Sequence, residues 1–240
     1  MAMDRYSSYA DLKATERQGI DYSIVSLDRH SPVTIIAPHG GQIEPPTSTL
    51  AIAIAADDYN AYCFDGLRTD RQHHELHITS QNFDEPIGCK LIAKSDTVIA
   101  LHGRRDRKAP KSVWIGGLDG ELCYGIATYL GRAGFQTATG GHEFPALDLA
   151  NICNRGRRKK GVQLEIPRSL RDILSGDTEV FNQFTNAIRL SIADAVCAGA
   201  ADSIARQKSE SKVDRSFRSF AMTASPNADA RPALTRSRKA

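Results

Sequence analysis

Short apolar runs alternate along the chain with longer segments whose apolar residues recur every three or four positions. The short runs predict buried strands and the periodic segments predict helices. We expect strands over residues 22–27, 33–37, 60–64, 75–79, 97–101, 135–138 and 161–166, and helices over 9–17, 49–56, 85–93, 119–133, 167–174 and 180–205. Because strands and helices alternate, the pattern favours one α/β domain with a central, mixed and mostly parallel sheet flanked by helices.

Two of these predicted strands end in a His-Gly pair, which contains His39 in the first case and His102 in the second. Pro38 ends the first strand, and two consecutive glycines allow the backbone to fold back sharply. The loop can therefore aim His39 and Glu44, five positions later, at one point. Two imidazoles and one carboxylate from such loops are typical of a catalytic zinc site with an open fourth position.

A further polar group, Glu165, lies inside the apolar run from Val162 to Ile166. Burying an ionised carboxylate is costly unless it is paired or used in chemistry. Active sites of open α/β sheets gather at the carboxyl ends of strands, where His39, His102 and Glu165 are all predicted to lie. Each residue also has a structural interpretation: a loop histidine, a satisfied core histidine and an ion-paired glutamate. The spacing differs from the helical H-E-x-x-H motif, so spacing alone leaves both interpretations open.

Composition and charge divide the chain into two parts. It has 240 residues, of which 41% are hydrophobic, enough for one large domain over residues 1–205. Residues 206–240 carry nine basic and three acidic side chains, so this tail has a charge of +6 and the remainder −3. The tail shows little periodicity, and we expect it to be disordered.

The chain also shows little sign of membrane insertion, export or disulfide bonding. No apolar run approaches the roughly 20 residues that span a membrane, and the first residues lack a signal-peptide core. We therefore expect a cytoplasmic location, although release by cell lysis would leave no mark in the sequence. The five cysteines are widely spaced and form no C-x-x-C pair, which disfavours disulfides and a cysteine zinc cage.

Seven short motifs, taken together in order, resemble the poly-γ-glutamate hydrolase family of bacteriophages and related bacterial genomes. They are Pro38-His39-Gly40-Gly41-x-Ile43-Glu44, Leu76-His77-Ile78-Thr79-Ser80, Asn82-Phe83-Asp84-Glu85-Pro86, His102-Gly103, Gly116-Gly117-Leu118, Asn151-x-x-Asn154-Arg155 and Gly161-Val162-Gln163-Leu164-Glu165-Ile166. The resemblance covers roughly Tyr6 to Leu190. The basic tail and the loop from His73 to Glu75 depart from the pattern.

The resemblance implies a fold similar to that of zinc carboxypeptidases and one zinc ion held by His39, Glu44 and His102. Glu165 would match the general base. The metal would polarise the scissile carbonyl and activate water, while Glu165 would take a proton from the water and deliver it to the leaving amine. The implied function is hydrolysis of γ-glutamyl amide bonds.

The implied substrate is a polyanion, because each γ-linked glutamate keeps a free α-carboxylate. We predict that Arg155 binds such a carboxylate, since its planar fork matches two oxygens, or else steadies the oxyanion. Asn154 is a further candidate for substrate binding, as is Asn151, for which capping a turn is an equal alternative. His77 could contact the substrate or a metal ligand, or be an ordinary strand histidine.

Two basic runs, residues 104–111 and 155–160, flank predicted site residues and could steer a polyanion. One alternative function is a zinc amidase acting on small N-acyl amino acids or on γ-linked cell-wall peptides. Another is a non-catalytic, phage-related nucleic-acid-binding protein. Only 7% of residues are aromatic, so the stacking platforms of single-strand binders are lacking and nucleic acid is disfavoured as a partner. We expect a monomer.

Overall fold

A computed structural model of the protein describes residues 4–72, 75–106 and 111–199. Residues 1–195 form one compact unit, and of the second unit, residues 196–240, only 196–199 are described. The predicted domain boundary after residue 205 and the basic tail lie outside the described residues, so both stay predictions. None of the described helices combines the length and apolar character needed to cross a membrane.

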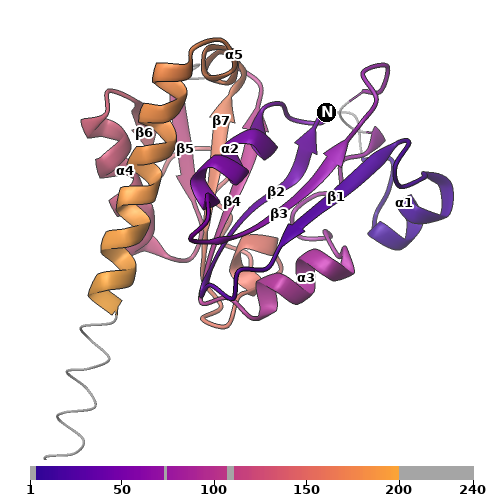
Figure 1. The fold of residues 1–240 in the computed structure, drawn as a ribbon, viewed down its shortest axis with the longest axis horizontal. Coiled ribbons are helices and arrows are strands. Elements are labelled where there is room, and N and C mark those ends of the chain that lie inside the picture. The colour runs from indigo at the N-terminus through magenta and orange to yellow at the C-terminus, as the bar shows by residue number, and fades with distance from the viewer. Residues whose placement is uncertain (1–3, 73–74, 107–110, 200–240) are drawn as a thin grey trace, which may run out of the picture. The chain divides into compact units, whose positions relative to one another are not determined.

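Seven strands form a single mixed sheet at the centre of the fold, in the order β1-β3-β2-β4-β7-β5-β6 (Figure 1). Their bounds are β1 Tyr22–Leu27, β2 Val33–Gly41, β3 Asn60–Gly66, β4 Thr97–Arg104, β5 Ser112–Gly116, β6 Gln136–Ala138 and β7 Val162–Pro167. The β1–β3 and β5–β7 pairs are antiparallel, and the other four neighbouring pairs are parallel. The predicted mixed, mostly parallel sheet is confirmed.

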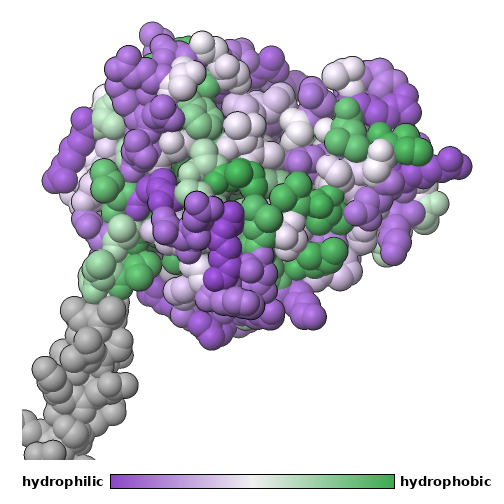
Figure 2. Space-filling view, viewed as in Figure 1, coloured by the Kyte–Doolittle hydropathy of each residue, from purple (hydrophilic) through white to green (hydrophobic). Residues whose placement is uncertain are grey.

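Helices cover both faces of the sheet. They are α1 Tyr9–Thr15, α2 Thr47–Ala55, α3 Pro86–Ala93, α4 Gly120–Arg132, α5 Arg168–Gly176, the short 3₁₀ helix η2 Ile152–Arg155, and a C-terminal helix that starts at residue 178. One apolar cluster packs α2, α4, α5 and the C-terminal helix on one face. A second cluster packs α1, α3 and η2 on the other. On the side drawn in Figure 2, apolar side chains gather over α2 and the strands beside it. Val25 and Leu27 of β1 and Ile52 of α2 pack against the first cluster and are only partly buried.

Alternate residues of each central strand enter opposite clusters, as the pleat of a strand requires. In β4, Ile99 and Leu101 join the first cluster, whereas Val98 and Ala100 join the second. Since both faces are covered, the strand appears in the sequence as a continuous apolar run. By the same alternation His102, two positions after Ala100, lies on the face of the second cluster.

Two sequence-based assignments differ from the structure. The predicted strand over residues 75–79 is wrong: the segment is irregular and joins no ladder. Its backbone is satisfied by side chains instead, because Thr79 N–H donates to Asp4 at 2.9 Å and the Ile78 carbonyl accepts from His39 at 2.7 Å. Strand β5 was not predicted, although it lies between β7 and β6.

Candidate metal centre

The three predicted metal ligands come together at the carboxyl edge of the sheet. The Nδ1 atoms of His39 and His102 are 3.1 Å apart. Oε2 of Glu44 lies 3.5 Å from Nδ1 of His39 and 3.9 Å from Nδ1 of His102. The side chains are almost fully buried, with exposed fractions between 1% and 4% for the three residues. Three potential ligand atoms of different residues therefore face a common point.

Local chain geometry explains this convergence. Strands β2 and β4 are parallel neighbours, so their carboxyl ends carry His39 and His102 to the same edge. The pairing of β2 with β3 shifts register between Ala37 and Gly40. Gly41 then adopts φ 57°, a left-handed conformation that suits glycine. The resulting turn brings Glu44 back, and its Oε2 accepts a hydrogen bond from Gly103 N–H at 2.7 Å.

The histidine nearest the centre of this group, His39, is oriented to offer a lone pair. Its Nε2–H donates to the carbonyl of Ile78 at 2.7 Å. A neutral imidazole that donates from Nε2 keeps Nδ1 as an acceptor, and metal-binding histidines are commonly fixed by such a bond. Tetrahedral ligand atoms about 2.1 Å from zinc lie about 3.4 Å apart. The distances of 3.1–3.9 Å between the three candidate ligand atoms are close to that separation, so the donor set fits a divalent metal.

A further imidazole, that of His77, lies beside the group. Its ring centroid is 3.9 Å from that of His39, and its Nδ1 pairs with Oδ1 of Asp4 at 2.8 Å. His39, Glu44 and His77 offer ligand atoms that all lie within 4.8 Å of one another. The described residues thus contain four candidate ligands for one ion, namely His39, Glu44, His77 and His102.

The predicted base, Glu165, lies on β7 directly opposite His102 on β4. Paired residues of parallel strands project to the same face, so both side chains belong to the site. Glu165 is 7% exposed and accepts a hydrogen bond from Nε2 of Gln163 at 2.8 Å. Burial and then the negative charge of Glu44 raise its pKa well above the usual value, while nearby arginines oppose the shift. A carboxyl group whose pKa is raised toward neutrality is suited to both accepting and returning a proton.

Two buried arginines place positive charge next to these carboxylates. The guanidinium of Arg104 lies 3.7 Å from the ring centre of Trp114, which pairs with Glu165 across the β5–β7 ladder. The guanidinium of Arg171 contacts Gly103 and donates to the backbone carbonyls of Pro45 and Ile166. Sequence reasoning missed Trp114 because β5 was not predicted, and missed Arg171 because nothing local distinguishes a helix arginine that points inward.

A family model described as poly-gamma-glutamate hydrolase matches residues 6–189. The chain belongs to this family. It is 38% identical over 191 residues to the SPbeta prophage-derived protein YoqZ of Bacillus subtilis strain 168, and 35% identical over 177 residues to YmaC of the same organism. These matches cover 79% and 72% of the chain and 66% and 73% of the two relatives. The predicted resemblance is confirmed.

Solved structures agree with this family assignment. The chain superposes on a structure of bacteriophage poly-gamma-glutamate hydrolase with a TM-score of 0.78 and 28% identity, covering 82% of this chain and 100% of that one. A structure described as zinc-free apo YndL gives a TM-score of 0.74 and 28% identity, covering 80% and 98%. N-formylglutamate amidohydrolase from Ralstonia eutropha shares the fold alone, at a TM-score of 0.50 and 12% identity, covering 75% and 99%.

Within this family fold, Arg155 is placed differently from the sequence prediction. Its guanidinium donates to the backbone carbonyls of Phe83 and Gln81 at 2.6 Å each and of Ala150 at 2.7 Å, with a longer contact of 3.5 Å to Ser80. The fork is therefore used to fasten η2 to the segment 80–83. This geometry favours a structural clamp over the predicted substrate contact.

The two asparagines of the same motif, Asn151 and Asn154, are also held by hydrogen bonds within the fold. Oδ1 of Asn154 accepts from the N–H groups of Leu118 and Gly161, and its Nδ2 donates to the carbonyls of Ala146 and Asp148. Because all its hydrogen-bonding capacity is used within the fold, the geometry does not favour the predicted substrate contact. Asn151 caps η2 by accepting from Cys153 N–H at 3.1 Å.

The basic run at residues 155–160 lies at the opposite edge of the sheet from the metal centre. Arg157 forms a two-pronged pair with Asp96, at 2.8 Å for both contacts, just before the start of β4. Lys160 pairs with Asp119 at 3.0 Å. The prediction that this run flanks the catalytic residues is wrong, because the run enters β7 at its amino end. Residues 107–110 of the other run lie outside the described residues.

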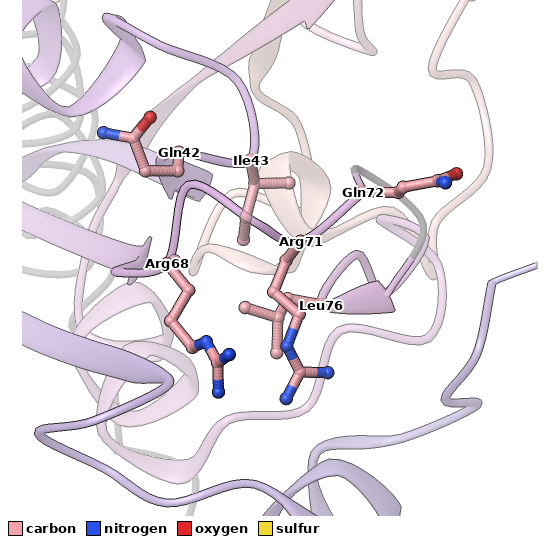
Figure 3. Close-up of a pocket in the computed structure, with 7 residues that line it drawn as sticks. Gln42, Ile43, Arg68, Arg71, Gln72 and Leu76 are labelled. Atoms are coloured by element: carbon pink, nitrogen blue, oxygen red, sulfur yellow. The ribbon is translucent and has the colours of Figure 1, made fainter.

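A small pocket of about 10 Å³ lies beside the turn from Gly41 to Glu44, here called the ligand loop, and its lining includes Gln42, Ile43, Arg68 and Arg71 (Figure 3). The two arginine side chains run side by side there. Both are engaged by carboxylates: Arg71 donates to Glu16 at 3.0 Å and Arg68 pairs with Asp70. A space of this size holds about one water molecule, so the pocket is too small for a substrate.

Proposed function

We propose that this protein hydrolyses γ-glutamyl amide bonds of poly-γ-glutamate, using one divalent metal ion, zinc, held by His39, Glu44 and His102. The observation that carries the proposal is the convergence of three buried ligand atoms at spacings of 3.1–3.9 Å. The family match supports the substrate, and the zinc-free description of the YndL structure supports the choice of metal.

When bound, the metal would supply Lewis-acid polarisation of the scissile carbonyl and lower the pKa of water. The residues around it prepare that chemistry. The carbonyl of Ile78 fixes the ring of His39, and Gly103 N–H fixes the carboxylate of Glu44. Orienting contacts of this kind hold ligands in place before the metal arrives, so little reorganisation is needed.

Glu165 takes the proton from the attacking water and returns it to the leaving amine. Its place opposite His102 puts the carboxyl group on the same face of the sheet as the ligands. The products are a free amine on one fragment and a γ-carboxylate on the other. A carboxyl group whose ionised form is disfavoured by burial releases its proton to the amine at little cost.

The positive charge beside this carboxyl group comes from Arg104, whose charge opposes the raised pKa of Glu165. The guanidinium of Arg104 is held in place by donating to the backbone carbonyls of Arg105 at 3.1 Å and Ser112 at 2.6 Å. We assign to its charge the electrostatic stabilisation of ionised Glu165 and of negative charge that develops on the substrate. Stacking on Trp114 holds the guanidinium plane in a defined orientation. Arg104→Lys should therefore lower kcat/KM at least about tenfold, because a point charge cannot reproduce the planar fork.

The decisive experiment incubates zinc-loaded protein with poly-γ-glutamate and reads product sizes by mass spectrometry. Fragments differing by whole glutamate units support the proposal. Cleavage of short N-acyl amino acids with an intact polymer would instead support the zinc amidase. DNA binding that survives removal of zinc, with neither substrate cleaved, would support the nucleic-acid-binding alternative.

Single substitutions test the role of each residue. His102→Ala should lose the metal, whereas His30→Ala, an exposed histidine far from the ligand loop, should keep it. His77→Ala should keep the metal as well; its loss would move His77 into the ligand set. Glu165→Gln should bind zinc at full stoichiometry and lose turnover. Near wild-type kcat in that variant would remove Glu165 as the base.

A further inference from the structure

A chain of buried hydrogen bonds leads from the backbone of η2 to Glu165. Cys153 N–H donates to Oδ1 of Asn151 at 3.1 Å. Nδ2 of Asn151 donates to Oε1 of Gln163 at 2.9 Å, and Nε2 of Gln163 donates to Oε1 of Glu165 at 2.8 Å. Asn151, Gln163 and Glu165 are 2%, 5% and 7% exposed. Water is therefore largely excluded as a replacement partner for these groups.

The direction of this chain is determined at its first step. A backbone N–H can only donate, so the asparagine atom that faces Cys153 must be its oxygen. The asparagine nitrogen then faces Gln163 and requires an acceptor, which turns the glutamine oxygen toward it. The glutamine nitrogen is left facing Glu165. Each amide orientation follows from the one before it, without any assumption about the carboxyl group.

We infer that Asn151 and Gln163 are positioning residues that reserve Oε1 of Glu165 as a hydrogen-bond acceptor, so that the catalytic proton is carried on Oε2 alone. Because a hydroxyl oxygen is a weaker acceptor than a carbonyl or carboxylate oxygen, a proton on Oε1 would weaken the bond from Nε2 of Gln163, whereas a proton on Oε2 leaves that bond intact. This inference rests on the proposed function in taking Glu165 as the base. It gives Asn151 and the Gln163-x-Glu165 pair one joint purpose.

The sharpest test is Asn151→Asp, which is nearly isosteric and keeps the cap because an aspartate oxygen can still accept from Cys153 N–H. Its second oxygen cannot donate. The Gln163 amide must then turn its nitrogen toward residue 151 and its oxygen toward Glu165, which places two acceptors in contact unless Oε1 is protonated. We expect kcat on poly-γ-glutamate to fall at least about tenfold, with KM and zinc content unchanged.

Two controls test whether the loss of kcat in Asn151→Asp is transmitted through Gln163 or comes from the added charge itself. In Gln163→Met the hydrogen bonds between residue 151 and Glu165 are already lost, so adding Asn151→Asp should have no further effect on kcat. If Asn151→Asp lowers kcat equally with and without the Gln163→Met substitution, the new charge acts through space and the inference is overturned. Asn182→Asp adds the same charge at an exposed position and should leave kcat unchanged. An unaltered kcat in Asn151→Asp, or a loss of zinc, would also overturn it.

A spectroscopic readout works without substrate or metal. Infrared difference spectra of the metal-free protein between alkaline and acidic solution contain the carbonyl band of protonated Glu165, identified by its absence in Glu165→Gln. If Oε1 is the carbonyl oxygen that accepts from Gln163, Gln163→Met should move this band to higher frequency. An unmoved band would refute the inference. A moved band together with normal turnover of Glu165→Gln would leave the hydrogen-bond chain standing and remove only the proposed base.

Discussion

The role of Arg155 can be decided by replacing it with lysine. A substrate contact and a structural clamp both lose the planar fork in Arg155→Lys, but they predict different measurements. In the structure three short hydrogen bonds join its guanidinium to the carbonyls of Phe83, Gln81 and Ala150, at 2.6–2.7 Å. A lysine ammonium can reach one of these sites and leaves the others without their donor.

The expected cost follows from the number of bonds lost. A hydrogen bond contributes a net 0.5–1.5 kcal/mol or so, and somewhat more when one partner is charged. Arg155 is half-buried, so water can partly replace the lost donors, and we take about 1 kcal/mol for each of two bonds. The free energy of unfolding should fall by about 2 kcal/mol. For a domain of this size that corresponds to a decrease in Tm of about 4–8 °C.

Thermal and urea unfolding of the zinc-loaded variant measure this change, and Arg157→Lys is the matched control. Arg157 belongs to the same basic run but forms an exposed pair with Asp96, and such pairs are worth no more than about 1 kcal/mol. Arg155→Lys should be the less stable variant, with KM for poly-γ-glutamate within about threefold of wild type. An unchanged Tm together with a large rise in KM would refute the clamp and restore the predicted substrate contact.

Three further predictions concern the metal, the ligand loop and the core. Saturating zinc at about 100 times Kd should raise the free energy of unfolding of the stripped protein by about 2.7 kcal/mol; no shift in a thermal melt would contradict a site in the folded state. Gly40→Ala should destabilise the protein by at least about 2 kcal/mol and weaken zinc binding, because a Cβ there would collide with Ser48 and Asp65; a normal melt and zinc titration would show that the loop tolerates it. Phe184→Ala, fully buried in the first cluster, should cost about 3–5 kcal/mol while the folded fraction keeps its kcat; a selective loss of kcat would link the C-terminal helix to catalysis.

Much of the fold could be predicted from local pattern. Strands β1, β2, β3, β4, β6 and β7 were expected within a few residues of their observed bounds, because strands covered on both faces appear as continuous apolar runs. The irregular segment at residues 75–79 has a similar composition but no strand neighbour, and no local signal separates the two cases. Strand β5 is only five residues long, and its place beside β7 depends on a pairing far away in sequence.

The candidate metal site could be predicted for a related reason. His39 and His102 lie near the carboxyl ends of β2 and β4, and parallel neighbouring strands must end at the same edge. Glu165 was conspicuous because a carboxylate in an apolar strand is costly without a purpose. These inferences depend only on the neighbours of each residue along the chain and on the rule that parallel strands end at a common edge. No contact between distant segments had to be known in advance.

Long polar side chains behaved differently. Arg155 and Asn154 suggested substrate contacts, and Arg157 belonged to a basic run expected to steer a polyanion. The fold instead gives their donors to carbonyls and carboxylates contributed by other segments. The sequence by itself determined most of the strands, the covered sheet and the three candidate ligand residues at its edge, because burial and turn formation depend on neighbouring residues. Only the tertiary structure decided which polar groups remain for chemistry, because a flexible side chain is satisfied by whatever partner the fold brings within about 3 Å of it.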